Sequence, residues 1–260
     1  MNPNDEFYIG WESKSPQGIG SWMRRIVLLL LLLSAGLGLA MVAAQRSIGV
    51  SVFEWGTIKD FSGILQIKPY PHLLVLRPGS ARQPADFSSY YLVKPFKFGL
   101  DPELVNRLDG QTVSLRGTLI YRGNQTMIEA LPDSIKLIEH RDARLASAAV
   151  AQPVSLGRRT LVGEIVDSKC YLGVMNPGQL TPHRACAIRC ISGGCPPVLL
   201  VRQTNGAALY LLLVAGDGRP VNKRVLDMVA EPLQITGEVV RQGSLLILRA
   251  DPATYRRWPL

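Results

Sequence analysis

The chain has 260 residues, an apolar fraction of 47% and a formal net charge of +9. This length accommodates two domains of roughly 100 residues each and a membrane anchor. The sequence contains no phosphate-binding glycine loop and no pair of carboxylates in a catalytic arrangement, which argues against the enzyme classes built on those motifs.

Residues 26–44 form an apolar run of 19 residues without a charge. A helix over this run is about 28 Å long, enough to cross a bilayer core of about 30 Å. We therefore predict an uncleaved transmembrane signal anchor over residues 26–44, preceded by an N-terminal segment, residues 1–25. The alternative is a signal peptide cleaved after Ala44, since Val42, Ala43 and Ala44 resemble a small-residue cleavage site.

Basic residues lie mainly before this run, at Lys14, Arg24 and Arg25, and only Arg46 follows it closely. The positive-inside rule then predicts a single-pass protein of the inner (cytoplasmic) membrane, with a cytoplasmic N-terminus and periplasmic or extracellular domains. The part beyond the run holds 26 Lys and Arg against 17 Asp and Glu. This balance suits an anionic membrane surface or an acidic partner, or serves solubility alone. In that compartment we expect no nucleic-acid partner.

An internal repeat organises the rest of the chain. When the sequence is shifted by 120 residues, Gly117 aligns with Gly237 and Gly123 aligns with Gly243. Gly63 similarly aligns with Gly163 after a shift of 100 residues. The two halves therefore share one plan, and the second half carries about 20 extra residues after its first strand.

Periodicity predicts the same elements in both halves. In the first half we predict strands at 61–68, 73–77 and 89–94, a helix at 102–108, and strands at 111–121 and 126–130. In the second half we predict strands at 160–167, 198–203 and 208–215, a helix at 221–230, and strands at 233–241 and 244–250. Three strands, a helix and two strands follow the order of an OB-fold, a small five-stranded barrel.

The predicted fold class is therefore mainly β, with one transmembrane helix followed by two OB-like barrels. The first barrel domain spans residues 48–138 and the second spans residues 157–258. A linker rich in Ala and Arg, residues 139–156, joins them. The extra segment of the second domain, residues 168–197, contains all four cysteines of the chain.

This segment is predicted to hold a short helix. Thr181 is suited to cap it, Pro182 suits its first position, and Gly193 and Gly194 end it. His183, Cys186 and Cys190 then lie on one helical face. Cys170 precedes the helix and Cys195 follows it.

Three kinds of chemistry fit these residues. The first is a pair of disulfides among Cys170, Cys186, Cys190 and Cys195, which suits an oxidising compartment. A bridge between Cys186 and Cys190 within one helical turn is awkward, so pairings that join Cys170 to the helix are preferred.

The second is a Cys3His site for zinc or another thiophilic metal, formed by Cys170, His183, Cys186 and Cys190. The third is redox thiol chemistry at Cys186, close to His183 and to the start of the helix. The cysteine spacing fits neither a Rieske cluster nor covalent c-type haem. Apart from such a metal we expect no cofactor.

The pattern D-x-x-C, H-x-x-C-A-x-x-C and G-G-x-P-P occurs at residues 167–170, 183–190 and 193–197. Together with the opening residues 4–8, it resembles uncharacterised bacterial membrane-anchored proteins that are encoded near respiratory or Rieske-type redox proteins. The resemblance implies a protein partner in a membrane redox complex. We therefore expect a non-catalytic accessory subunit whose second barrel presents the Cys/His loop, with a metal-binding or thiol-redox protein as the alternative.

Overall fold

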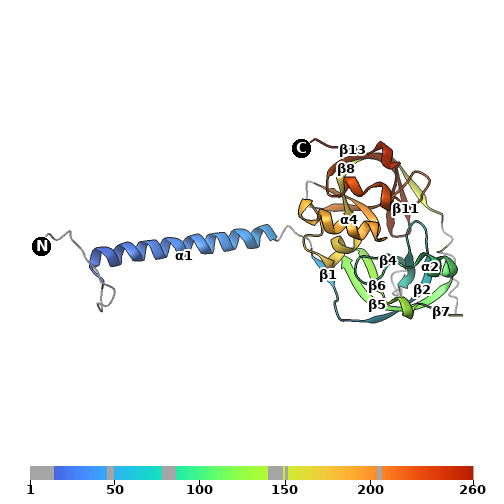
Figure 1. Cartoon of the computed structure of the whole chain (residues 1–260), viewed down its shortest axis with the longest axis horizontal. Coiled ribbons are helices and arrows are strands. Elements are labelled where there is room, and N and C mark those ends of the chain that lie inside the picture. Colours follow the sequence, from blue (N-terminus) through green and yellow to red (C-terminus); the bar gives the residue numbers. More distant parts are fainter. Residues whose placement is uncertain are drawn as a thin grey trace. The chain divides into compact units, whose positions relative to one another are not determined.

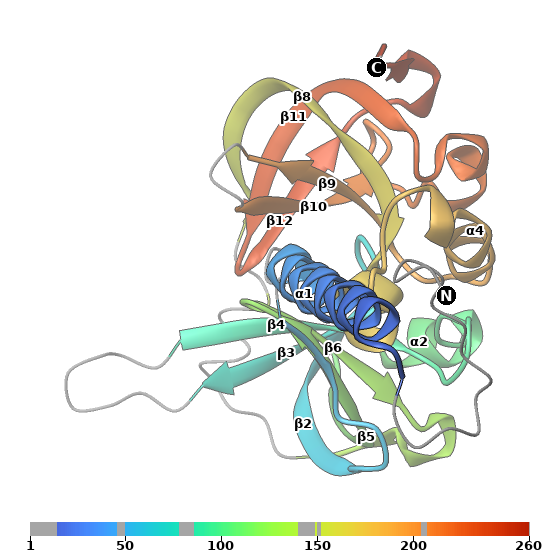
Figure 2. The same cartoon turned by 90° about the vertical axis from the view of Figure 1, so that its left-hand side faces the viewer.

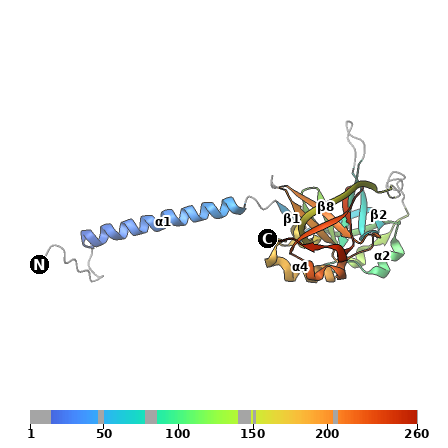
Figure 3. The same cartoon turned by 90° about the horizontal axis from the view of Figure 1, so that it is seen from above.

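The computed structural model describes residues 15–45, 50–77, 86–139, 149, 152–203 and 207–259. Helix α1 spans Gln17–Gln45 and is unbroken (Figure 3). Within its residues 17–44 an 18-residue window has a mean hydropathy of 2.7, and the length and composition of the helix suffice for a membrane anchor or for a signal sequence. The helix begins at Gln17, before the predicted span of residues 26–44, and it includes Arg24 and Arg25. Residues 1–14 of the predicted N-terminal segment lie outside the described residues.

The first barrel follows the predicted strand order. Its five strands are β2 Lys59–Gln66, β3 His72–Arg77, β4 Asp86–Val93, β5 Thr112–Arg122 and β6 Gln125–Ala130. Strand β3 pairs with β2 and β4, β6 pairs with β5 and, in parallel, with β4, and β2 pairs with β5, which closes the barrel. Helix α2, Pro102–Leu108, connects β4 to β5, and the Asp101 side chain caps it. Short strands β1, Ser51–Phe53, and β7, Lys136–Leu137, extend the sheet at β5.

The second barrel repeats this topology. Its strands are β8 Val154–Asp167, β9 Pro197–Arg202, β10 Ala208–Val214, β11 Pro232–Gln242 and β12 Leu245–Arg249, with β13 Arg256–Arg257 added to β11. The parallel pair β10–β12 and the long antiparallel pair β8–β11 close it. The predicted fold class, two OB-like barrels after an apolar helix, is confirmed. Strand β8 begins at Val154, inside the predicted linker of residues 139–156. Residues 140–148, 150 and 151 of this linker lie outside the described residues.

The helix predicted at residues 221–230 is wrong. Two 3-10 turns, η4 Asn222–Arg224 and η5 Leu226–Met228, take its place. Val221, Val225 and Val229 are fully buried, so the apolar spacing that suggested a helix is satisfied by successive turns packed on the barrel. β-branched residues at all three buried positions disfavour an α-helix there.

The two barrels form one unit, Val50–Leu260 (Figures 1 and 2). Each has its own apolar interior, and a further buried cluster joins Tyr70, Tyr91 and Met127 of the first barrel to residues of the second. The Tyr70 hydroxyl donates to the carbonyl of Leu213 at 3.1 Å. Burial raises the pKa of this hydroxyl, so it stays a neutral donor. All four cysteines belong to this cluster or pack against it, so the insertion of the second barrel lies where the barrels meet.

Candidate functional site

The insertion between β8 and β9 consists of three short helical segments. These are a π-helical turn η2, Cys170–Val174, a 3-10 turn η3, Thr181–His183, and helix α4, Arg184–Ser192. The turn η2 contacts β1, β5 and β6 of the first barrel. Pro182 lies in the first turn as predicted, but Thr181 does not cap the helix. Instead Leu180 has a positive φ of 67°, and its N–H donates to the Glu164 carboxylate at 2.9 Å.

The cysteines converge without forming disulfides. The Sγ atom of Cys170 lies 3.9 Å from that of Cys186 and 4.0 Å from that of Cys190. A disulfide bond is only about 2.05 Å long, and all four cysteines are free thiols. The predicted disulfides are therefore not present. The reason is geometric: the sulfurs of α4 gather around the Cys170 sulfur, so Cys170 has two near neighbours and is bonded to neither.

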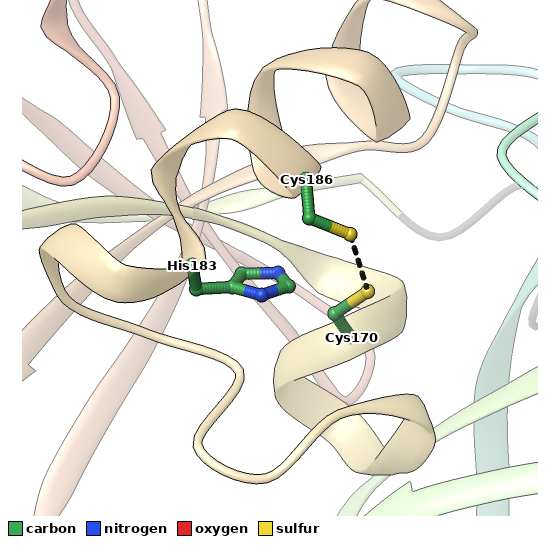
Figure 4. Close-up of side chains that lie close together, drawn as sticks. All are labelled: Cys170, His183 and Cys186. Atoms are coloured by element: carbon green, nitrogen blue, oxygen red, sulfur yellow. Dashed lines mark hydrogen bonds between the residues drawn. The ribbon is translucent and has the colours of Figure 1, made fainter.

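His183 completes this group. The ligand atoms of Cys170, His183 and Cys186 all lie within 4.8 Å of one another. Figure 4 shows the three side chains directed toward a common point from η2, η3 and α4. With zinc–sulfur bonds of about 2.3 Å, two ligands of a tetrahedral ion lie about 3.8 Å apart. The distances from Sγ of Cys170 to Sγ of Cys186 and to Sγ of Cys190 match that spacing, so the three sulfurs fit a thiophilic metal ion.

A buried carboxylate holds the histidine. Nε2 of His183 donates to Oδ2 of Asp167 at 2.8 Å, and the other oxygen, Oδ1, accepts from the Cys170 N–H at 2.8 Å. Asp167 is fully buried and His183 is 4% exposed. Burial raises the pKa of Asp167, while the bond from His183 opposes that rise. With Nε2 bound to Asp167, Nδ1 is the nitrogen left for a metal.

The buried thiols are coupled through hydrogen bonds that shift their pKa values. Hydrogen bonds from Cys170 and Cys195 hold the pKa of the Cys190 thiol well below its usual range. The same interactions, together with burial, raise the pKa of Cys170 and of Cys195. The three buried thiols therefore shift one another's pKa values in opposite directions. Asp167, Cys170 and Cys190 form a second group of candidate metal ligands. Cys195, which was also predicted as a site residue, contacts Cys190 but belongs to neither group.

A lysine from the first barrel reaches the same thiols. Nζ of Lys97, in the connection between β4 and α2, lies 2.7 Å from Sγ of Cys186 and 3.9 Å from Sγ of Cys190. The hydrogen bond to Cys186 raises the pKa of Lys97, which keeps this side chain an ammonium. The site is therefore built from both barrels.

A second lysine holds the connection that carries Lys97. The Lys169 side chain is almost fully buried, and its Nζ donates to the carbonyls of Lys94 at 2.8 Å and Phe96 at 2.7 Å. It also forms an ion pair with Glu129 on β6. On the other side, the N–H of Gly99 donates to the carbonyl of Gly193 at 2.9 Å. These bonds fix the backbone on both sides of Lys97.

Sequence reasoning found the cysteines and His183 but did not assign roles to Asp167, Lys97 or Lys169. The spacing of Asp167 three residues before Cys170 is the one local signal for the carboxylate. Lys97 lies 89 residues from Cys186, and no local pattern connects them.

Comparisons with known proteins add little. No family model matches the chain, and no curated protein matches it. Among solved structures, a deletion variant of the single-stranded DNA-binding protein from Thermus aquaticus matches with 13% identity and a TM-score of 0.21, over 82% of this chain and 89% of that chain. This match, to a protein that is described as binding single-stranded DNA, disagrees with our prediction of no nucleic-acid partner, and we withdraw that prediction. A likeness at this TM-score carries no argument that this chain binds DNA.

Proposed function

We propose that this chain is a membrane-anchored protein that binds one thiophilic divalent metal ion, such as zinc, with Cys170, His183, Cys186 and Cys190 as ligands. The observation that carries the proposal is the convergence of the Cys170, His183 and Cys186 ligand atoms within 4.8 Å. Cys190 supplies a fourth ligand 4.0 Å from Cys170.

The surroundings of the ligands support this assignment. A carboxylate that holds the N–H of a ligand histidine is the usual support of a zinc-bound imidazole, because it fixes the tautomer and the ring orientation. Asp167 supplies that support from the end of β8. Cysteine ligands in an oxidising compartment would otherwise be lost to disulfides, and a bound metal protects them.

The burial of the ligands points to a structural role. Cys170 is 2% exposed, Cys190 1% and His183 4%, and four protein ligands leave no position for a substrate. When bound, the metal would stabilise an insertion whose helical segments are short. It would do so where the second barrel contacts the first, and this supports a binding role rather than a catalytic one.

Metal analysis of the full-length protein, purified in detergent without reductant or chelator, tests the proposal. We expect about one zinc per chain, four thiols that become reactive only after chelation and denaturation, and loss of the metal in His183→Ala. A matched control is His72→Gln, which changes a buried histidine that contacts Tyr70 and Gln66 instead of the cysteines. Absence of metal together with two disulfides would refute the proposal.

We also propose that the anchored barrels form an accessory subunit of a bacterial redox or respiratory complex and face the periplasm. The support is the apolar helix α1 and the resemblance carried by residues 167–197. Affinity purification from detergent-solubilised membranes is expected to recover a redox-active membrane protein at fixed stoichiometry. Reporter fusions after residue 15 and after residue 259 test the orientation, and activity of a cytoplasmic reporter at the C-terminal position contradicts it.

A further inference from the structure

The start of the first barrel exposes three large apolar side chains close together in the chain. Residues 50–58, which we call the Trp55 segment, contain Val50 at 82% exposure, Trp55 at 78% and Ile58 at 48%. Single exposed apolar side chains are ordinary on a protein surface, whereas a concentration of them marks a site of interaction with a protein or a membrane. The Trp55 segment is therefore a candidate interaction surface.

Hydrogen bonds hold the Trp55 segment in a fixed shape. Its strand β1 pairs with β5, and the N–H of Glu54, the next residue, donates to a β5 carbonyl at 3.0 Å. A turn follows, in which the Thr57 N–H donates to the Glu54 carbonyl at 3.0 Å and Gly56 has a positive φ of 79°. The rings of Phe53 and Trp55 meet edge to face, with 5.3 Å between their centroids. Trp55 is therefore presented on an ordered turn, and covering it costs little conformational freedom.

The chemistry of the Trp55 segment indicates which kind of partner it fits. Glu54 is its only charged residue, and this carboxylate is paired with Lys59 at 2.6 Å. Tryptophan is enriched where the acyl chains of a bilayer meet the headgroups, because its ring is apolar and its N–H is polar. A nearly neutral segment with an exposed tryptophan therefore suits that boundary better than it suits a strongly charged partner.

The length of the chain keeps the Trp55 segment close to the membrane. The apolar run ends at Ala44, so in a membrane-spanning α1 this residue lies at the edge of the acyl core. Val50 is six residue steps further along the chain, a distance of at most about 20 Å. The headgroup region occupies about 5–8 Å of this distance. The Trp55 segment is therefore within reach of the lipid surface.

We propose that the Trp55 segment docks on the boundary between acyl chains and headgroups of the bilayer that α1 crosses. This docking rests on the membrane anchor of the proposed function, and it adds a second contact between the chain and the lipid. Val50, Trp55 and Ile58 enter the boundary, and the ion pair of Glu54 with Lys59 stays at the level of the headgroups. The bilayer is the partner because a tethered surface stays at a high effective concentration.

Docking also sets the position of the cysteine insertion. Turn η2, which begins with Cys170, packs on β1 so closely that a Cβ on Gly173 would lie 2.5 Å from the Val52 carbonyl. The docked segment and the turn are therefore parts of one packed unit. A docked Trp55 segment keeps the candidate metal site at a constant distance from the bilayer, where another protein of the same membrane can reach it.

Fluorescence quenching by brominated lipid tests the docking on the full-length protein in phosphatidylcholine vesicles. Bromine near the carboxyl end of the acyl chains quenches a tryptophan at the boundary by contact. The differences between wild type and Trp22→Tyr, Trp55→Tyr or Trp258→Tyr give the contribution of each tryptophan. Trp22 lies in α1 and reports on the anchor, and Trp258, which is 43% exposed, is the matched surface control.

We expect bromine to reduce the contributions of Trp22 and Trp55 at least about 2-fold, since both are placed at the headgroup level, and to leave that of Trp258 unchanged. A second pair of variants tests the apolar contact itself. Ile58→Asp is expected to lose about half or more of the Trp55 quenching, because a carboxylate is costly at the acyl boundary. Val154→Asp, at a position of β8 with 51% exposure, is expected to keep the wild-type quenching.

The outcomes separate the docking from the anchor on which it rests. Quenching of Trp22 without quenching of Trp55 overturns the docking and leaves the anchor in place. A protein partner on the Trp55 segment gives this same result, because the vesicles contain only the purified chain. Absence of quenching at both residues contradicts the anchor and the docking together. Equal quenching of Trp55 and Trp258 also overturns the docking, since the barrels then adhere to lipid without a preferred surface.

Discussion

His183 and Asp167 are 16 residues apart in the chain, and their side chains are joined by a buried hydrogen bond of 2.8 Å from Nε2 to Oδ2. The bond connects the end of β8 to the start of the segment that carries Cys186 and Cys190. It fixes the imidazole next to the sulfurs before any metal binds.

Asp167→Asn is therefore expected to weaken zinc binding about 10- to 100-fold, as loss of a carboxylate behind a ligand histidine usually does. Competition with a chromophoric chelator measures the affinity. Asp217→Asn, which changes an exposed carboxylate paired with Arg219, serves as the control and is expected to bind zinc normally. Equal affinity in wild type and Asp167→Asn would show that the carboxylate has no part in the site.

Cys190 and Cys195 are the two candidates for the fourth metal ligand, and the variant Cys195→Ala distinguishes between them. Because Cys195 belongs to neither group of candidate ligands, the variant is expected to keep one metal ion per chain. Cys190→Ala is expected to bind metal more weakly, since it removes a proposed ligand. Cobalt(II) titration followed by absorption spectroscopy reports both the affinity and the number of thiolate ligands. If Cys195→Ala loses the metal while His183→Ala keeps it, the ligand set is four cysteines.

Lys169→Met is expected to destabilise the protein by about 3–5 kcal/mol, because it removes one partner of a buried ion pair. The side chains of Lys169 and Glu129 are 2% and 13% exposed, so Glu129 would be left largely buried without its cation. Chemical denaturation of the full-length protein measures the loss. The double variant Lys169→Met/Glu129→Gln is expected to recover part of it, and the exposed substitution Lys136→Met is the control. A loss below about 1 kcal/mol, the range of surface pairs, contradicts this expectation.

Glu231 links the start of α4 to the second barrel. Its carboxylate lies 2.7 Å from Arg184 of α4 and 2.5 Å from Arg257 of β13. The hydrogen bonds from Arg257 and then Arg184 lower the pKa of Glu231 below its ordinary value of 4.5. Because the pKa in the folded state is lower than in the unfolded state, this stabilisation is present above pH 4.5 and is lost as the pH falls further.

Glu231→Gln is therefore expected to lower stability by about 0.5–1 kcal/mol at neutral pH, a small effect because both arginines are partly exposed. Thermal melts between pH 3 and pH 7 are expected to converge for wild type and variant at the acidic end. A difference that persists unchanged at low pH would mean that the charge of Glu231 is not the cause.

The barrels could be predicted because their information is local. Alternation of apolar residues defines each strand, and paired glycines such as Gly123 and Gly243 mark corresponding hairpin turns, both with positive φ. The prediction failed at residues 221–230, where valines spaced four apart indicate a helix but are equally satisfied by two 3-10 turns. A spacing pattern specifies which side chains are buried and does not by itself specify the backbone that buries them.

The sequence by itself determined that the chain has an apolar N-terminal helix, two similar barrels, and one insertion that concentrates Cys170, Cys186, Cys190, Cys195 and His183. Only the tertiary structure decided that the sulfurs converge without bonding, that Asp167 holds His183, and that Lys97 of the other barrel reaches Cys186. Distances between side chains from segments far apart in the chain depend on how the barrels pack, and packing is a property of the folded chain rather than of any local pattern.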